Sequence, residues 1–143
     1  MLFDTSVWID FSKGKKTTAA DLLEKEIYSG RKVFVCPPVY QEVLQGIRSD
    51  LEYEELKQLM LSLDFLNVDS YYVAEAAANL YRSLRKKGIT IRNSNDCIIA
   101  CYAIHFNIKI VHTDRDFTKI AEDCIIPKKA VFNLMARRIL CSN

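Results

Sequence analysis

Short apolar runs alternate along the chain with longer stretches in which apolar residues recur every three or four positions. Such runs are typical of buried strands, and such stretches are typical of amphipathic helices. Turn-forming and helix-breaking pairs, including Ser29-Gly30 and Pro37-Pro38, separate several of them. The pattern predicts strands over residues 1–3, 33–36, 108–111 and 124–126, with a short extended segment at 65–68. It predicts helices over residues 19–28, 39–47, 50–63, 70–88 and 96–106, a helix start within 113–116 and a helical tail after 126.

Polar residues at the helix ends carry further signals. Ser70 is the expected N-cap of the long helix that ends at Gly88. Ser94 or Asn95 is the expected N-cap of the helix that begins at Asp96. These short polar side chains are favoured there because they accept hydrogen bonds from the first backbone N–H groups of a helix, which have no partner within it.

The order of the elements indicates the fold class. Strands separated by helices, with no hairpin turn signals between them, indicate a mainly parallel sheet, which helices must cover on both faces. No internal repeat, low-complexity tract or Gly/Ser/Pro linker divides the 143 residues. We therefore predict an α/β fold, with a mainly parallel central sheet flanked by helices on both faces, as a single domain over residues 1–143.

Acidic residues from four chain segments follow the predicted strands or begin the helices after them. They are Asp4, Glu42, Asp96, Asp114 and Asp116. Ligand sites in parallel α/β sheets lie beyond the carboxyl ends of the strands, where Asp4 and Asp114 are expected. Carboxylates that share a pocket must take up protons or bind cations, because their charges repel one another. The pattern thus predicts an acidic crevice.

Oxygen-only ligands favour hard cations such as Mg²⁺ or Mn²⁺ over zinc. Two such ions can activate water and stabilise a leaving oxygen in phosphodiester hydrolysis, so no histidine base is needed. The spacing leaves a structural interpretation open for each acid. Asp4 and Asp114 can cap the helices that follow them. Asp96 can complement a helix dipole, and Glu42 can be a solvated helix residue.

Four segments around these acids form a recognisable series. They read DTSVWID from Asp4, QEVLQG from Gln41, NDCIIA from Asn95 and HTDRDF from His112. Together they resemble the four successive motifs of PIN-domain nucleases, and those of the VapC-like toxins of bacterial toxin–antitoxin pairs in particular. One such motif is a weak signal, whereas four in the family's order are a strong one.

The resemblance implies a metal-dependent endoribonuclease that inhibits translation and uses Mg²⁺ or Mn²⁺. By motif position the catalytic acids are Asp4, Glu42, Asp96 and Asp114, and the metal ligands among them are Asp4, Asp96 and Asp114. The supporting residues are Ser6, Thr113 and Asp116. In the resembled toxins the region corresponding to residues 19–63 receives the C-terminal segment of the antitoxin, and the toxin commonly dimerises. The implied partners are therefore RNA, an antitoxin and a second copy of the chain.

A basic stretch without any acid precedes the Asp96 motif. It contains Arg82, Arg85, Lys86, Lys87 and Arg92. These residues fit an RNA-binding rim that contacts phosphates, and they equally fit a solvated helix end that complements the helix dipole. The formal net charge of the chain is only +2. Because five acids are assigned to the site, the rest of the chain is clearly basic, which favours a nucleic-acid partner.

Two other functions fit parts of the pattern. A PIN-like module can hold RNA or a protein without cutting it, but the complete set of motif acids counts against this alternative. A phosphoryl-transfer domain with an aspartyl nucleophile would suit Asp4 at a strand end. Haloacid-dehalogenase-like phosphatases, however, carry a second aspartate two positions on, where this chain has Ser6.

The cysteines and the N-terminal stretch indicate the compartment. The five cysteines are odd in number and include no Cys-x-x-Cys pair. Asp4 and Asp10 interrupt the apolar N-terminal stretch before it reaches the length of a signal peptide or a membrane span. We therefore expect reduced thiols and a cytoplasmic protein with no membrane contact. Cys97, Cys101 and His105 recur along one helical stripe, too far apart to converge on zinc, and we expect them in the core.

Overall fold

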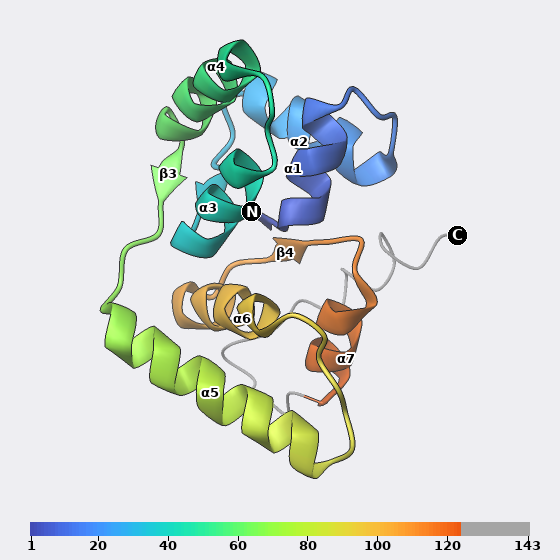
Figure 1. Cartoon of the computed structure of the whole chain (residues 1–143), viewed down its shortest axis with the longest axis vertical. Helices are drawn as coiled ribbons and strands as arrows, with labels where there is room; N and C mark the ends of the chain where they lie inside the picture. The colour runs from blue at the N-terminus through green and yellow to red at the C-terminus, as the bar shows by residue number, and fades with distance from the viewer. Residues whose placement is uncertain (124–143) are drawn as a thin grey trace. The chain divides into compact units, whose positions relative to one another are not determined.

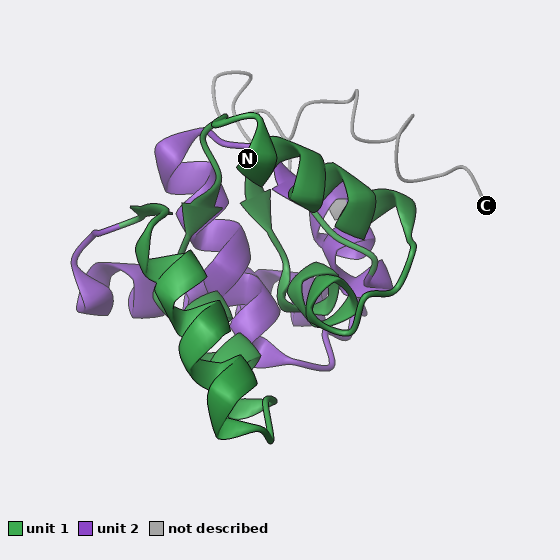
Figure 2. Cartoon of the chain, turned by 90° about the horizontal axis from the view of Figure 1, so that it is seen from above, with its two compact units in different colours: residues 1–66, 111–113 green, residues 67–110, 114–143 purple. Residues whose placement is uncertain are grey.

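The computed structural model describes residues 1–123, which form four strands and seven helices. The strand predicted at 124–126 and the helical tail after it lie outside these residues. The chain divides into two compact units (Figure 2). Unit 1 comprises residues 1–66 with 111–113, and unit 2 comprises residues 67–110 with the chain from Asp114 onward.

The strands are very short and pair in the order β3-β2-β1-β4. β3 and β4 are labelled in Figure 1. Their bounds are Leu2–Phe3 for β1, Phe34–Val35 for β2, Asp64–Phe65 for β3 and Ile110–Val111 for β4. β1 pairs in parallel with β2, and β2 pairs in parallel with β3. Next to β1, the carbonyl of Val111 in β4 accepts a hydrogen bond from the backbone N–H of Asp4 at 2.9 Å. The predicted α/β class with a parallel sheet is confirmed.

Unit 1 holds four helices around an apolar core. α1 (Thr5–Ser12) packs against α2 (Thr18–Tyr28) and α3 (Pro37–Gln45), and α3 packs against α4 (Asp50–Leu61). α3 begins at the prolines, because a proline lacks the N–H that would otherwise have no partner in the first helical turn. The largest completely buried side chains of this unit are Trp8, Phe3, Leu2, Leu23 and Met60.

Unit 2 is built on α6 (Ser94–Phe106), which packs against α5 (Ser70–Lys86) and α7 (Arg115–Asp123). Most of the apolar run of α6 is buried, including Cys97 and Cys101, as its composition predicts, and Ile98 is half-buried. His105, however, is exposed, and its ring meets the edge of Tyr72 with the ring centroids 5.5 Å apart. The expectation of a core histidine was wrong, because His105 lies in the last turn of α6, where this residue reaches solvent.

The N-cap of α5 differs from the sequence-based expectation. Asp69, and not Ser70, caps this helix, since the Asp69 carboxylate accepts a hydrogen bond from the backbone N–H of Tyr72 at 2.8 Å. Ser70 is already the first helical residue. The helix ends at Lys86, and Gly88 follows with a φ of +78°, a conformation that glycine adopts without steric cost.

The cysteines of the described residues, Cys36, Cys97 and Cys101, are buried. Within residues 1–123 no helix combines the length and the apolar character needed to cross a membrane.

Replacing Asp69 with alanine should lower the free energy of unfolding by about 1 kcal/mol, because it removes the side-chain cap of α5. Ser70→Ala is the matched control and should change it by less than about 0.5 kcal/mol, since Ser70 is exposed and lies inside the helix. Urea denaturation followed by circular dichroism measures both values. Equal losses in the two variants would contradict the assignment of Asp69 as the cap.

Candidate active site

Asp4 lies at the carboxyl end of β1 and caps helix α1. Its Oδ2 accepts hydrogen bonds from the backbone N–H and the hydroxyl of Ser6, at 3.2 and 2.6 Å. Only 5% of the residue is exposed. Burial raises the pKa of the Asp4 carboxyl above its ordinary value, although the hydrogen bonds from Ser6 oppose this effect. An adjacent cation would therefore stabilise the ionised form of Asp4.

Two predicted supporting residues are brought to Asp4 within unit 1. The Thr113 hydroxyl donates to the Ser6 hydroxyl oxygen at 2.8 Å, and the Ser6 hydroxyl in turn donates to Asp4. Thr113 and Ser6 are 107 positions apart in the sequence. The result is a relay of hydroxyl groups that orients one oxygen of Asp4.

Glu42 lies half-buried on α3 and is oriented by a residue that the sequence did not single out. The hydroxyl of Thr5 donates to Oε2 of Glu42 at 2.6 Å. The sequence offered one indication that Thr5 contributes to the site, namely its position between Asp4 and Ser6 in the first motif. Such a contact depends on how α1 and α3 pack, which periodicity does not reveal.

Cys36 precedes α3 and is completely buried. Burial raises the pKa of its thiol to about 12, and the negative charges of Asp4 and Glu42 add to the increase. The thiol therefore stays protonated at neutral pH in the metal-free protein. This end of unit 1 also holds the buried His112, whose positive charge opposes the increase in the pKa of Asp4.

In unit 2, Asp96 lies in the first turn of α6 and is 6% exposed. Asn93, and not the expected Ser94 or Asn95, caps this helix, because its side chain accepts a hydrogen bond from the backbone N–H of Asn95. The start of a helix carries a partial positive charge, which favours an ionised carboxylate at this position.

Asp114 precedes α7 and is about one-third exposed. Its Oδ1 accepts hydrogen bonds from the backbone N–H of Asp116 at 2.9 Å and from the guanidinium Nη2 of Arg92. The first of these bonds is the one that an N-cap makes, so the structural interpretation of Asp114 is realised. The same carboxylate also carries an ion pair.

Asp116 is completely buried, and cations and N–H groups occupy both of its oxygens. Oδ2 accepts from the backbone N–H and the Nε of Arg92 at 2.8 and 3.1 Å, and Oδ1 accepts from Lys119 at 2.7 Å. Burial opposes ionisation, but the bonds from Lys119 and Arg92 outweigh it and lower the pKa of Asp116 to about 2. Asp116, on α7, thus holds the loop that precedes α6. This is a supporting role.

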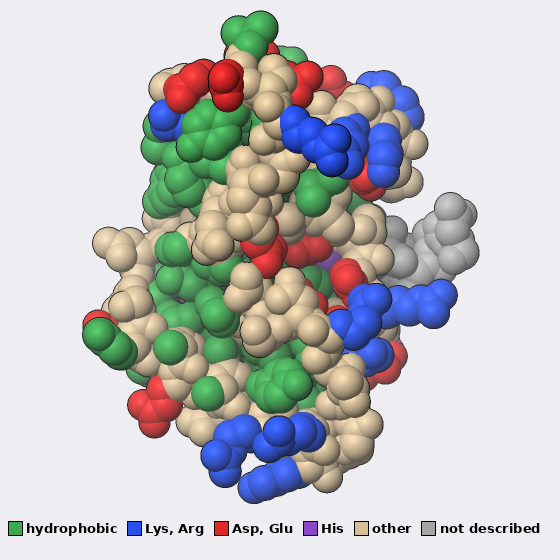
Figure 3. All heavy atoms as spheres, in the orientation of Figure 1, with side chains coloured by type: hydrophobic (Ala, Val, Ile, Leu, Met, Phe, Trp, Pro, Cys, Tyr) green, Lys and Arg blue, Asp and Glu red, His purple; other side chains and the backbone are tan. Residues whose placement is uncertain are grey.

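The basic stretch separates into two groups. Arg82, Arg85, Lys86 and Lys87 are exposed at the end of α5, and Lys and Arg side chains gather over that end at the bottom of Figure 3. Arg92 is different, since it pairs with Asp114 and Asp116. The sequence alone grouped all five as one rim.

A metal site can be tested against the donors that are present. Among the residues that the structure describes, no three His, Cys, Asp or Glu side chains are grouped so that they could hold a metal ion. Asp4 and Glu42 belong to unit 1, and Asp96 and Asp114 belong to unit 2. The chemistry of the donors fits a hard divalent cation, because all four are carboxylates and a cation would relieve the cost of burying Asp4.

Comparison with known proteins identifies the family. The model of the PIN domain matches residues 1–123. The chain belongs to the PIN-domain family. This match includes all of unit 1, unit 2 as far as residue 123, and all four motif segments.

Named relatives of this PIN-domain chain are ribonucleases. It is 38% identical over 125 residues to VapC ribonuclease Mb1587 of Mycobacterium bovis and to ribonuclease VapC11 of Mycobacterium tuberculosis, which covers 85% of this chain and 91% of each relative. A solved structure with the same fold is VapBC2 from Rickettsia felis bound to a DNA fragment from its promoter. Its TM-score is 0.65 at 19% identity, over 82% of this chain and 90% of the other. PIN-domain ribonucleases generally depend on metal ions.

Replacing Asp116 with asparagine should lower the free energy of unfolding at pH 7 by about 2 kcal/mol in EDTA, because the carboxyl pKa falls from 3.8 to about 2 on folding. A lowered pKa stabilises the fold above about pH 4, and this stabilisation disappears as the pH falls through about 2. The difference between variant and wild type should therefore shrink over that range. Urea denaturation at several pH values measures it.

The control for this prediction is Asp21→Asn, since Asp21 is exposed in the first turn of α2. It should change the unfolding free energy by less than about 0.5 kcal/mol. A deficit in Asp116→Asn that stays constant from pH 7 to pH 2 would show that the ion pairs do not cause it.

Proposed function

We propose that this chain is an endoribonuclease that hydrolyses RNA phosphodiester bonds with Mg²⁺ or Mn²⁺. The observation that carries the proposal is its 38% identity to two named VapC ribonucleases over 85% of the chain. The complete set of motif acids supports an active enzyme. By the same similarity, the chain is the toxin of a VapBC-like pair and inhibits translation in the cytoplasm.

The catalytic carboxylates in this proposal are Asp4, Glu42, Asp96 and Asp114, and the metal ligands are Asp4, Asp96 and Asp114. A divalent cation, when bound, supplies positive charge that neutralises the phosphodiester and promotes attack by water. The chain's own residues prepare the ligands for it. The relay from Thr113 through Ser6 orients Oδ2 of Asp4, and the hydroxyl of Thr5 orients Oε2 of Glu42.

The proposed protein partners are an antitoxin and a second copy of the chain. Large apolar side chains that are exposed on unit 1 support a partner over residues 19–63 and the strand that follows. They are Tyr28, Leu51, Leu61 and Phe65. These four side chains are the candidate contacts for such a segment, because protein partners commonly bind over exposed apolar groups.

Asp4→Asn and Asp96→Asn should each abolish metal-dependent cleavage of single-stranded RNA, because each removes a ligand charge. Asp4→Asn should also leave thermal stability in EDTA unchanged or higher. Asparagine still caps a helix, and the raised pKa of Asp4 means that its charge destabilises the folded state. Gel analysis of RNA cleavage and thermal unfolding measure the two effects.

The matched control is Asp10→Asn, which removes a charge from the same helix at a side chain that pairs with Lys15. Its cleavage rate should stay within about twofold of wild type. Metal-dependent cleavage that survives in Asp4→Asn, in Asp96→Asn and in the double variant would contradict the proposal. RNA binding by the wild type without any cleavage would favour a non-cleaving PIN-like module.

We also propose that the basic end of α5 contacts RNA phosphates. Its four exposed cations are Arg82, Arg85, Lys86 and Lys87. Changing all four to glutamine should weaken the binding of single-stranded RNA to an inactive Asp4→Asn protein. It should also flatten the dependence of log K on log salt by about 0.7 for each phosphate that the protein no longer neutralises. An unchanged salt slope, measured by fluorescence anisotropy, would remove this end of α5 from the interface.

A further inference from the structure

Arg92 is held at three points within unit 2. Its backbone N–H and its Nε donate to Oδ2 of Asp116 at 2.8 and 3.1 Å, while its Nη2 donates to Oδ1 of Asp114. Asp116 is a firm anchor, because it is completely buried and its other oxygen accepts from Lys119 at 2.7 Å. The guanidinium therefore links a buried carboxylate to a partly exposed one.

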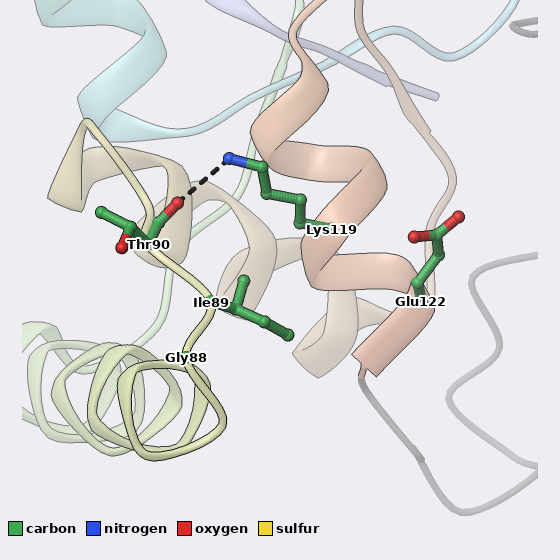
Figure 4. A pocket seen from close by; sticks show the side chains of 5 residues that line it. All are labelled: Gly88, Ile89, Thr90, Lys119 and Glu122. Atoms are coloured by element: carbon green, nitrogen blue, oxygen red, sulfur yellow. Dashed lines mark hydrogen bonds between the residues drawn. The ribbon is translucent and has the colours of Figure 1, made fainter.

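Lys119, on α7, makes a second link to the loop that precedes α6. Its Nζ also donates to the carbonyl oxygen of Thr90 at 3.1 Å (Figure 4). Thr90 precedes Arg92 by two residues. The backbone of this loop is thus fixed by bonds that do not involve the Arg92 side chain, so a change of that side chain alone leaves the loop attached.

Two donors converge on one oxygen of Asp114. The backbone N–H of Asp116 and the Nη2 of Arg92 both donate to Oδ1, which fixes the rotation of the carboxylate group. Only a planar fork reaches two carboxylates at once through Nε and Nη2. A lysine at this position would keep the charge but could not bridge the two carboxylates in this way.

We propose that Arg92 is a positioning residue for Asp114, which it holds in the orientation that binds a divalent cation. This inference rests on the proposed function only for the role of Asp114 as a metal ligand. Arg92 also places a positive charge beside that ligand. Positioning and charge repulsion have opposite consequences for cation binding, so the two are separable by experiment.

The test is Mn²⁺ binding to the full-length, metal-free protein, followed by electron paramagnetic resonance of the unbound ion. If Arg92 positions Asp114, Arg92→Lys should weaken Mn²⁺ binding about tenfold although the charge is kept, and Arg92→Gln should weaken it at least as much. Arg48→Lys, at an exposed residue of unit 1, is the matched control and should not change it. Unchanged binding in Arg92→Lys with tighter binding in Arg92→Gln would overturn the proposal in favour of charge repulsion.

A double-mutant cycle separates positioning from a general effect on the fold. In an Asp114→Asn background, Arg92→Lys should cause no further loss of Mn²⁺ affinity, because the ligand that it positions is gone. A further tenfold loss there would overturn the proposal. Thermal unfolding in EDTA establishes that each variant is folded at the assay temperature.

The result also distinguishes this inference from the proposed function. A wild-type protein that binds Mn²⁺ but does not cleave RNA contradicts the ribonuclease and leaves the role of Arg92 to be decided by the affinities. A wild-type protein that cleaves RNA, with Arg92→Lys retaining full Mn²⁺ affinity, contradicts the positioning role alone. Absence of Mn²⁺ binding by the wild type also overturns the positioning role of Arg92.

Discussion

A buried carboxylate needs hydrogen-bond donors around it, because burial removes the water that would stabilise its charge. The motif acids of this protein meet this constraint in two ways. Asp4 receives neutral donors, the N–H and hydroxyl of Ser6, and its pKa stays raised. Asp116 receives Arg92 and Lys119, and its pKa falls to about 2. The charge of Asp116 is already compensated within the protein, whereas that of Asp4 still favours an added cation.

This difference explains how two aspartates in one motif have separate roles. In HTDRDF, Asp114 stands before α7 and is partly exposed, while Asp116 lies in the first helical turn and is completely buried. Arg92 and Lys119 donate to both oxygens of Asp116, which leaves Asp114 as the candidate ligand of the two. The buried one holds Arg92, which reaches back to Asp114. The motif thus encodes both a candidate ligand and the support for that ligand.

The sheet positions functional side chains more than it stabilises the fold. Each strand is two residues long, so few ladder hydrogen bonds form, and the cores depend on helix packing. The ends of the strands nevertheless determine where polar side chains meet. The bond from the Asp4 backbone to the Val111 carbonyl aligns the ends of β1 and β4, and this alignment brings Thr113 to Ser6. The hydroxyl relay at Asp4 is a direct consequence of the pairing of two very short strands.

Residue pattern was sufficient for the α/β class, the parallel sheet and most of the elements, although it assigned no range to α1. The four motif segments were found by their resemblance to those of a known family. These features depend on local periodicity and residue type, which a single sequence contains. Tertiary structure alone decided which polar neighbour caps α5, and it brought Thr5 to Glu42 across 37 positions. It also paired Arg92 with Asp114 across 22 positions. Such pairings are set by how helices and loops pack, because contacts between residues distant in sequence leave no periodic trace along the chain.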